Sequence, residues 1–219
     1  MSLALLYMDE LKGFYKSKVM VVLWVGLPLM SLFVHQLSLD TGGMPLSTLA
    51  AILVSSIGGT LASVMLVVSI VTEKNGHVYD LFITRPVRKM DLIISKFFAV
   101  YSCIAVASLL ALALGFAVDY YGTEDPPSAL LKATLESFVV SLSMIAVSSS
   151  IGILLGVLSP SVLVGVILVI YGGNQLAALP MLPTALGMSY GVPFTITLGA
   201  ILAFVFLLIS LVVFGKRQF

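Results

Sequence analysis

Charged residues are scarce in this chain. Of its 219 residues, 10% are Asp, Glu, Lys or Arg and 60% are hydrophobic. A soluble domain carries about 25% charged residues, because its surface must face water. The composition therefore predicts an integral membrane protein. The 11 basic and 10 acidic residues nearly cancel, so the bulk charge predicts no nucleic-acid partner.

Cysteine and catalytic motifs are also lacking. Cys103 is the only cysteine, which excludes a disulfide or a cysteine-based metal site within one chain. The chain has no G-x-x-x-x-G-K-[ST] phosphate-binding loop and no H-E-x-x-H or G-x-S-x-G motif, the patterns of P-loop ATPases, zinc proteases and serine hydrolases. We therefore expect no enzymatic activity and no catalytic, cofactor-binding or metal-binding residues in this chain.

Long uncharged runs, by contrast, are abundant. One membrane span needs about 20 apolar residues, and six stretches qualify: residues 19–38, 48–72, 97–118, 137–158, 163–179 and 195–214. The predicted fold is an all-α membrane protein with six transmembrane helices. Residues 174–194 are too apolar for a solvated loop and hold three prolines, a pattern that favours a re-entrant hairpin before the last span. The alternative is an outer loop resting on the membrane surface.

The distribution of the basic residues predicts the orientation. With six spans, ten of the 11 basic residues fall on one side of the membrane, and basic residues collect on the cytoplasmic side. The exception, Lys132, lies beside an acidic loop. We therefore expect a multi-pass protein of the plasma membrane with both termini in the cytoplasm.

The first 17 residues have the pattern of an amphipathic helix. Tyr7, Leu11 and Phe14 fall on one side of a helical wheel, whereas Asp9 and Lys12 fall on the other. An interfacial helix over residues 1–17 is predicted, lying along the inner leaflet before the first span. A short helix packed on a partner protein would give the same pattern, so both interpretations stay open.

Few polar residues inside the spans suggest a function. Glu136 has 22 uncharged residues after it, so it can lie at the outer interface, and we favour that structural role over a role in transport. Small residues recur at every fourth position in the second and fourth spans, which allows two helices to approach closely. The predicted helix-packing residues are Ser55, Gly59, Ser63, Ser148, Gly152 and Gly156.

Residues 73–96 form the most distinctive segment. They hold charges of both signs, so the segment is expected in water or at the lipid headgroups. Within it, a short helix is predicted over residues 76–84, with Val78, Leu81 and Phe82 on its apolar side and His77, Asp80 and Thr84 on its polar side. The apolar side requires a partner protein or the membrane surface. Glu73 is expected to pair with a nearby base in a wet, screened setting worth about 0–1 kcal/mol.

The order of these features resembles the ABC-2 type permeases of ABC transporters. Glu73 and Gly76 precede a short helix, Arg85-Pro86-Val87-Arg88 follows it, and Lys96 stands at the entry of the next span. The amphipathic amino-terminal helix, the six spans and the hairpin before the last one extend the resemblance over residues 1–219 as a single transmembrane domain. His77 and Tyr79 depart from the family, which often has small or acidic residues at these positions.

The resemblance implies the membrane subunit of an ATP-driven exporter. It implies a separate cytosolic ATPase subunit that binds ATP and Mg, a second permease copy, identical or paralogous, and coupling through residues 73–96. The ATPase-coupling residues would be Glu73, Gly76, His77, Val78, Tyr79, Asp80, Leu81, Phe82, Arg85 and Pro86.

Two other classes of function stay open. One is a secondary carrier or small channel that works without ATP, and the other is a membrane scaffold or assembly factor. A soluble P-loop protein that associates with this chain would favour the ABC transporter, whereas ion-dependent uptake by the chain alone would favour the carrier.

Overall fold

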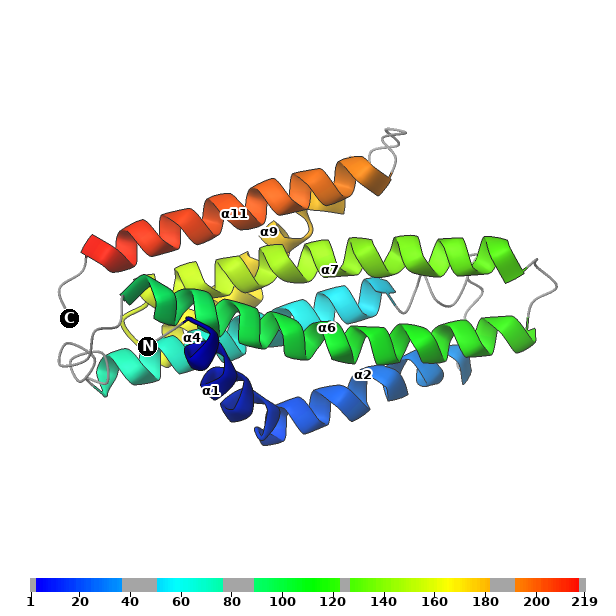
Figure 1. The fold of residues 1–219 in the computed structure, drawn as a ribbon, viewed down its shortest axis with the longest axis horizontal. Coiled ribbons are helices and arrows are strands. Elements are labelled where there is room, and N and C mark those ends of the chain that lie inside the picture. The colour runs from blue at the N-terminus through cyan, green and yellow to red at the C-terminus, as the bar shows by residue number, and fades with distance from the viewer. Residues whose placement is uncertain (1–2, 37–50, 77–88, 123–126, 182–191, 217–219) are drawn as a thin grey trace.

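The computed structural model describes residues 3–36, 51–76, 89–122, 127–181 and 192–216 (Figure 1). This part of the chain is helical, without a strand. Five helical stretches are long and apolar enough to cross a membrane, and a sixth is obtained if a bent pair of helices counts as one span. The prediction of an all-helical protein with five or six helices able to span a membrane is therefore confirmed.

The bent pair consists of the first two helices, α1 (Leu3–Tyr15) and α2 (Lys18–Gln36). They meet at 69°. The chain turns at Ser17, whose amide donates to the Phe14 carbonyl at 3.0 Å and whose hydroxyl accepts from the Val19 amide at 3.3 Å. This hydroxyl satisfies one of the free N–H groups at the start of α2.

The next three helices lie nearly parallel in Figure 1, and α6 and α7 are the longest of them. Their bounds are Gly59–Asn75 for α4, Lys89–Gly122 for α6 and Pro127–Leu158 for α7. A π-helical turn, η1 (Val54–Gly58), leads directly into α4. Because α4 reaches Asn75 and α6 begins at Lys89, both ends of the predicted segment 73–96 are parts of long helices.

The last third of the chain contains an interrupted helical stretch. Its parts are α8 (Val162–Leu168), the π-helical turn η3 (Val169–Gly173), α9 (Asn174–Ala177) and the 3₁₀ turn η4 (Leu179–Met181). The last described helix is α11 (Val192–Lys216). The Ser161 hydroxyl caps α8 by accepting from the Val164 amide at 3.4 Å. Residues 174–181 thus continue this stretch, and residues 182–191 of the predicted hairpin lie outside the described part.

The helices pack in two groups around α7. α4 and α11 lie against α7, whereas α1 and α2 lie against α6, which itself contacts α7 (Figure 1). The main core includes Leu66, Ile70, Ile93, Ile104 and Ile145. Large apolar side chains also lie on the surface, among them Leu163 and Val22, which are 71% and 68% exposed. Such a continuous apolar exterior is what a lipid-facing protein needs.

Candidate functional site

The two predicted stripes of small residues meet where α4 crosses α7. Ser148 Oγ donates to the Gly59 carbonyl at 2.7 Å, and Ser63 Oγ donates to the Ser148 carbonyl at 2.6 Å. A Cβ atom on Gly152 would lie 2.5 Å from the Ser63 Cα, and one on Gly156 would lie 3.2 Å from the Ile70 Cβ. Glycine at these positions therefore allows the two backbones to approach. Ser55, in the η1 turn before α4, is also buried, and its hydroxyl donates to the Ile52 carbonyl of its own helical stretch at 2.9 Å.

A second contact of α4 is built from charges. The Lys96 ammonium, on α6, lies 2.6 Å from Glu73 Oε1 on α4 and 2.8 Å from Glu10 Oε1 on α1. It also donates to Ser69 Oγ at 3.1 Å, and Ser69 in turn donates to Glu73 Oε1 at 3.1 Å. We call these four residues the Lys96 cluster. It joins three helices at one point, with partners up to 86 positions apart in the sequence.

The burial of Lys96 corrects two sequence-based expectations. The residue is 1% exposed, so its side chain does not lie in water, whereas the charge pattern of residues 73–96 predicted a segment in water or at the headgroups. Glu73 pairs with this buried ammonium, and its side chain is 27% exposed. The setting is therefore not the wet, screened one expected for it, and loss of either partner would leave charges that water reaches only in part.

The cluster carries more negative than positive charge. Two carboxylates share one ammonium among the described residues. Burial raises the pKa of Glu10 above its ordinary value of 4.5, the positive charge and hydrogen bond of Lys96 oppose this, and the nearby Glu73 and Asp9 charges reinforce it. The Glu10 carboxyl therefore takes up a proton at a higher pH than an ordinary glutamate does.

The end of α4 also contacts the turn between α7 and α8. Lys74, which follows Glu73, donates from Nζ to the Ser159 carbonyl in this turn at 2.8 Å. The Gly76 amide then donates to the Thr72 carbonyl at 2.9 Å and ends the helix with φ of −83°. This end of α4 is thus fixed to α1, α6 and the α7–α8 turn just before residues 77–88 begin.

Of the ten predicted coupling residues, only Glu73 and Gly76 belong to the described part. They lie within one turn of each other at the end of α4. The remaining eight lie outside the described residues: His77, Val78, Tyr79, Asp80, Leu81, Phe82, Arg85 and Pro86.

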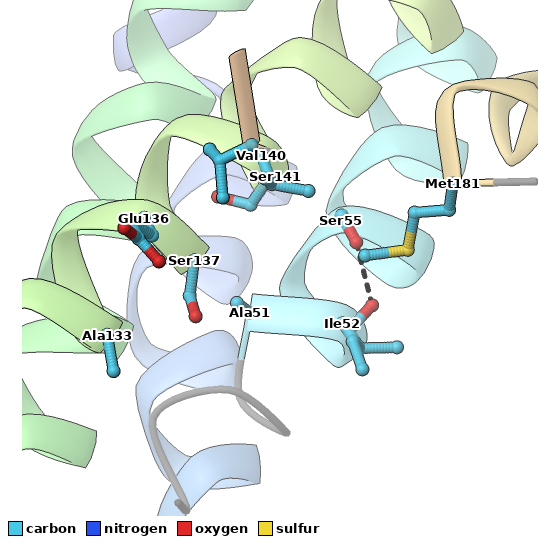
Figure 2. A pocket seen from close by; sticks show the side chains of 10 residues that line it. Ala51, Ile52, Ser55, Ala133, Glu136, Ser137, Val140, Ser141 and Met181 are labelled. Atoms are coloured by element: carbon cyan, nitrogen blue, oxygen red, sulfur yellow. Dashed lines mark hydrogen bonds between the residues drawn. The ribbon is translucent and has the colours of Figure 1, made fainter. Parts of the chain in front are cut away.

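A cavity of about 260 Å³ lies beside Glu136 (Figure 2). Glu136 and Ser137 of α7 face it from one side, and Ile52, Ser55 and Met181 face it from the other. The Ser55 hydroxyl is bonded to its own helix. Glu136 Oε1 lies 4.0 Å from the ammonium of Lys132, whose side chain is 78% exposed. Such a screened pair contributes little to stability, and the structural role predicted for Glu136 stays a prediction.

Metal chemistry finds no support among the residues that the structure describes. They include no group of three His, Cys, Asp or Glu side chains that could hold an ion. Cys103 is buried and unpaired with any other cysteine.

Sequence reasoning missed Glu10 and Ser69 as partners of Lys96. A signal was present, since Lys96 is followed by a long uncharged run and Met90–Val118 has the composition of a span. A lysine that enters such a helix needs a buried counter-ion. The identity of the carboxylates that act as counter-ions depends on contacts between distant segments. The periodicity of one helix gives no information about such contacts.

No protein-family model and no curated protein matches the chain in sequence comparisons.

Proposed function

We propose that the chain is the membrane subunit of an ATP-driven exporter of the ABC-2 type. It would be a multi-pass protein of the plasma membrane with six spans and cytoplasmic termini, α1 at the interface and residues 174–194 as an outer re-entrant segment. It would have no enzymatic activity of its own. A separate cytosolic ATPase subunit would bind ATP and Mg, and a second permease copy would complete the transporter.

The Lys96 cluster carries this proposal. Glu73 lies about half a turn before the end of α4, and Lys96 lies about two turns after the start of α6. The two helices that flank residues 77–88 are therefore tied together by a buried ion pair close to that segment. A displacement of the segment by a partner ATPase would move both helices together, and Glu10 would pass the movement to α1.

A purely structural role is the competing explanation. Buried ion pairs often contribute little net stability, because desolvation offsets their attraction. A pair that serves only the fold would be replaceable by apolar residues without loss of transport. A pair that transmits movement would not be replaceable in this way, and this difference can be measured in an assembled complex.

The test of the proposal is purification of the chain in mild detergent, followed by mass spectrometry and an ATPase assay. We expect a P-loop protein in a fixed ratio to the chain, and ATP hydrolysis that changes when the complex is moved into lipid. A chain that purifies without a P-loop protein and transports solute when it is reconstituted alone would contradict the proposal.

One observation favours a second function, a proton-coupled carrier. The Glu10 carboxyl has a raised pKa next to a buried lysine, and carriers use such groups to exchange protons. A pH gradient across liposomes that contain only this chain would then drive uptake, and Glu10→Gln would abolish it. The ABC-type proposal expects no such uptake.

A further inference from the structure

A groove with a volume of about 560 Å³ runs between the amino-terminal helices and α4. α1 and α2 pack against α6, whereas α4 packs against α7, so these two groups of helices leave a gap. Leu61, Val64 and Met65 form the α4 wall, Gly13 lies on the α1 wall, and Glu10 and Ser69 lie at one end. We call this the α1–α4 groove.

The two ends of the groove differ in chemistry. Glu10 is the one charged side chain among the described residues that line it. From Ser69 to Leu61 the α4 wall extends for eight residues, or about 12 Å of helix, and apart from Ser69 its lining residues are apolar. Val19 and Val68 on the rim are 44% and 38% exposed, so the apolar part opens to the surrounding medium.

At its charged end, the groove exposes the Glu10 carboxylate to an entering molecule. The side chain of Lys96 is 2% exposed, whereas those of Glu10 and Glu73 are 23% and 27% exposed. The ammonium is therefore covered, and a molecule entering the groove meets the carboxylate that lines it. Because the cluster holds two carboxylates and one ammonium, a second cation at this end would bring it to neutrality.

We propose that the α1–α4 groove binds a membrane lipid whose headgroup carries an ammonium, as in phosphatidylethanolamine. The ammonium pairs with the Glu10 carboxylate, and an acyl chain lies along Val64, Met65 and Leu61. The apolar wall continues the lipid-facing surface of α4, and the single charged end selects the headgroup by charge complementarity. This proposal requires insertion into a membrane and is independent of ATP coupling.

Two glycines allow a matched test. A Cβ atom on Gly13 would have no atom within 4 Å, so Gly13→Phe can place a ring in the groove from a position where the backbone has room for a side chain. Gly26 on α2 is equally open and does not line the groove, so Gly26→Phe serves as the control. Glu10→Gln keeps the shape of the end and removes its charge.

The experiment uses the full chain in phosphatidylglycerol nanodiscs with a trace of photoactivatable lipid. Phosphatidylethanolamine and phosphatidylglycerol probes carry the same diazirine acyl chain, and mass spectrometry locates the labelled residues. We expect the ethanolamine probe to label residues 61–69 at least about fivefold more than the glycerol probe. Gly13→Phe should remove this labelling and Gly26→Phe should keep it. Glu10→Gln should make the two probes equal.

Three results would overturn the proposal. Equal labelling by both probes in the wild-type chain would show that the headgroup is not selected. Labelling that persists in Gly13→Phe would place the lipid elsewhere. An absence of lipid labelling, with residues 61–69 instead crosslinked to a second copy or another protein, would assign the groove to a protein partner.

Discussion

Helix α4 has two contacts that follow different physical rules. Towards α7 it is neutral and close-packed, with Gly152 against Ser63 and hydroxyls bonded to carbonyls. Towards α1 it leaves a groove, and the Lys96 cluster connects the two helices at one end. The first contact resists closer approach because its backbones are already near their closest distance, and its hydrogen bonds resist separation. The second is held by a few charged groups with open space beside them, and this is the side on which movement is easier.

The largest expected effect comes from overfilling the close-packed contact. In Gly152→Leu the new Cβ would lie 2.5 Å from a backbone atom of Ser63, which cannot move aside without separating two helices. We expect a loss of more than about 3 kcal/mol of stability, seen as little folded protein in detergent. Gly172→Leu is the control, since no atom lies within 4 Å of its Cβ position. Equal yields of the two variants would contradict the described α4–α7 contact.

Breaking the charged contact should have the next largest effect. Lys96→Met leaves Glu10 and Glu73 side by side without their counter-ion. Because both carboxylates keep some access to water, we expect a loss of about 2–3 kcal/mol, below the 3–5 kcal/mol of a fully buried broken pair. Adding Glu10→Gln and Glu73→Gln to Lys96→Met should recover most of the loss in thermal unfolding. No recovery would mean that packing of the lysine stem dominates.

Two adjacent serines give a smaller and sharper comparison. Ser148 bonds the Gly59 carbonyl and contacts Ser63, whereas the buried Ser149 hydroxyl has no hydrogen-bond partner among the described residues. Ser148→Ala should cost about 1 kcal/mol, and Ser149→Ala should be neutral or stabilising. Unfolding midpoints in the same detergent measure both. A larger loss for Ser149→Ala would contradict the assigned hydrogen bonds.

The smallest expected effect is the pH dependence that Glu10 contributes. Its pKa is raised in the folded chain above the ordinary 4.5, so the folded state binds more protons than the unfolded state between these two values. The contribution of Glu10 to stability is therefore greatest below pH 4.5 and declines as the pH rises through the folded pKa. The melting temperature of wild type minus that of Glu10→Gln should fall from pH 4.5 to pH 7. A difference that rises over this range would reverse the sign of the assigned shift.

Local patterns in the sequence explain the parts of the fold that could be predicted. Uncharged runs are long enough to identify the apolar helices, including the fifth stretch, and the structure shows this stretch interrupted by η3 and α9 at Gly172-Gly173-Asn174. Small residues at every fourth position indicated the close contact between α4 and α7.

The Lys96 cluster could not be predicted in the same way. Charge density suggested a wet segment from residue 73 to residue 96, but both ends lie on long helices and Lys96 is buried. The partner Glu10 belongs to α1, near the amino terminus, and α1 is far from α6 in the sequence although it packs against it. Only the three-dimensional arrangement brings α1, α4 and α6 together, and the groove beside the cluster follows from that arrangement as well.

The most direct test of the proposed coupling is the ATPase rate of the purified complex with a charge on either side of the predicted short helix. Leu81→Asp and Phe82→Asp place a charge on its apolar side, and Thr84→Asp places one on its polar side as the matched control. If the segment is seated in a partner ATPase, the first two should abolish transport-coupled hydrolysis with normal membrane insertion, because an unpaired charge at an interface costs several kcal/mol. Thr84→Asp should keep most of the activity. Hydrolysis and transport near wild type in Leu81→Asp would contradict the account.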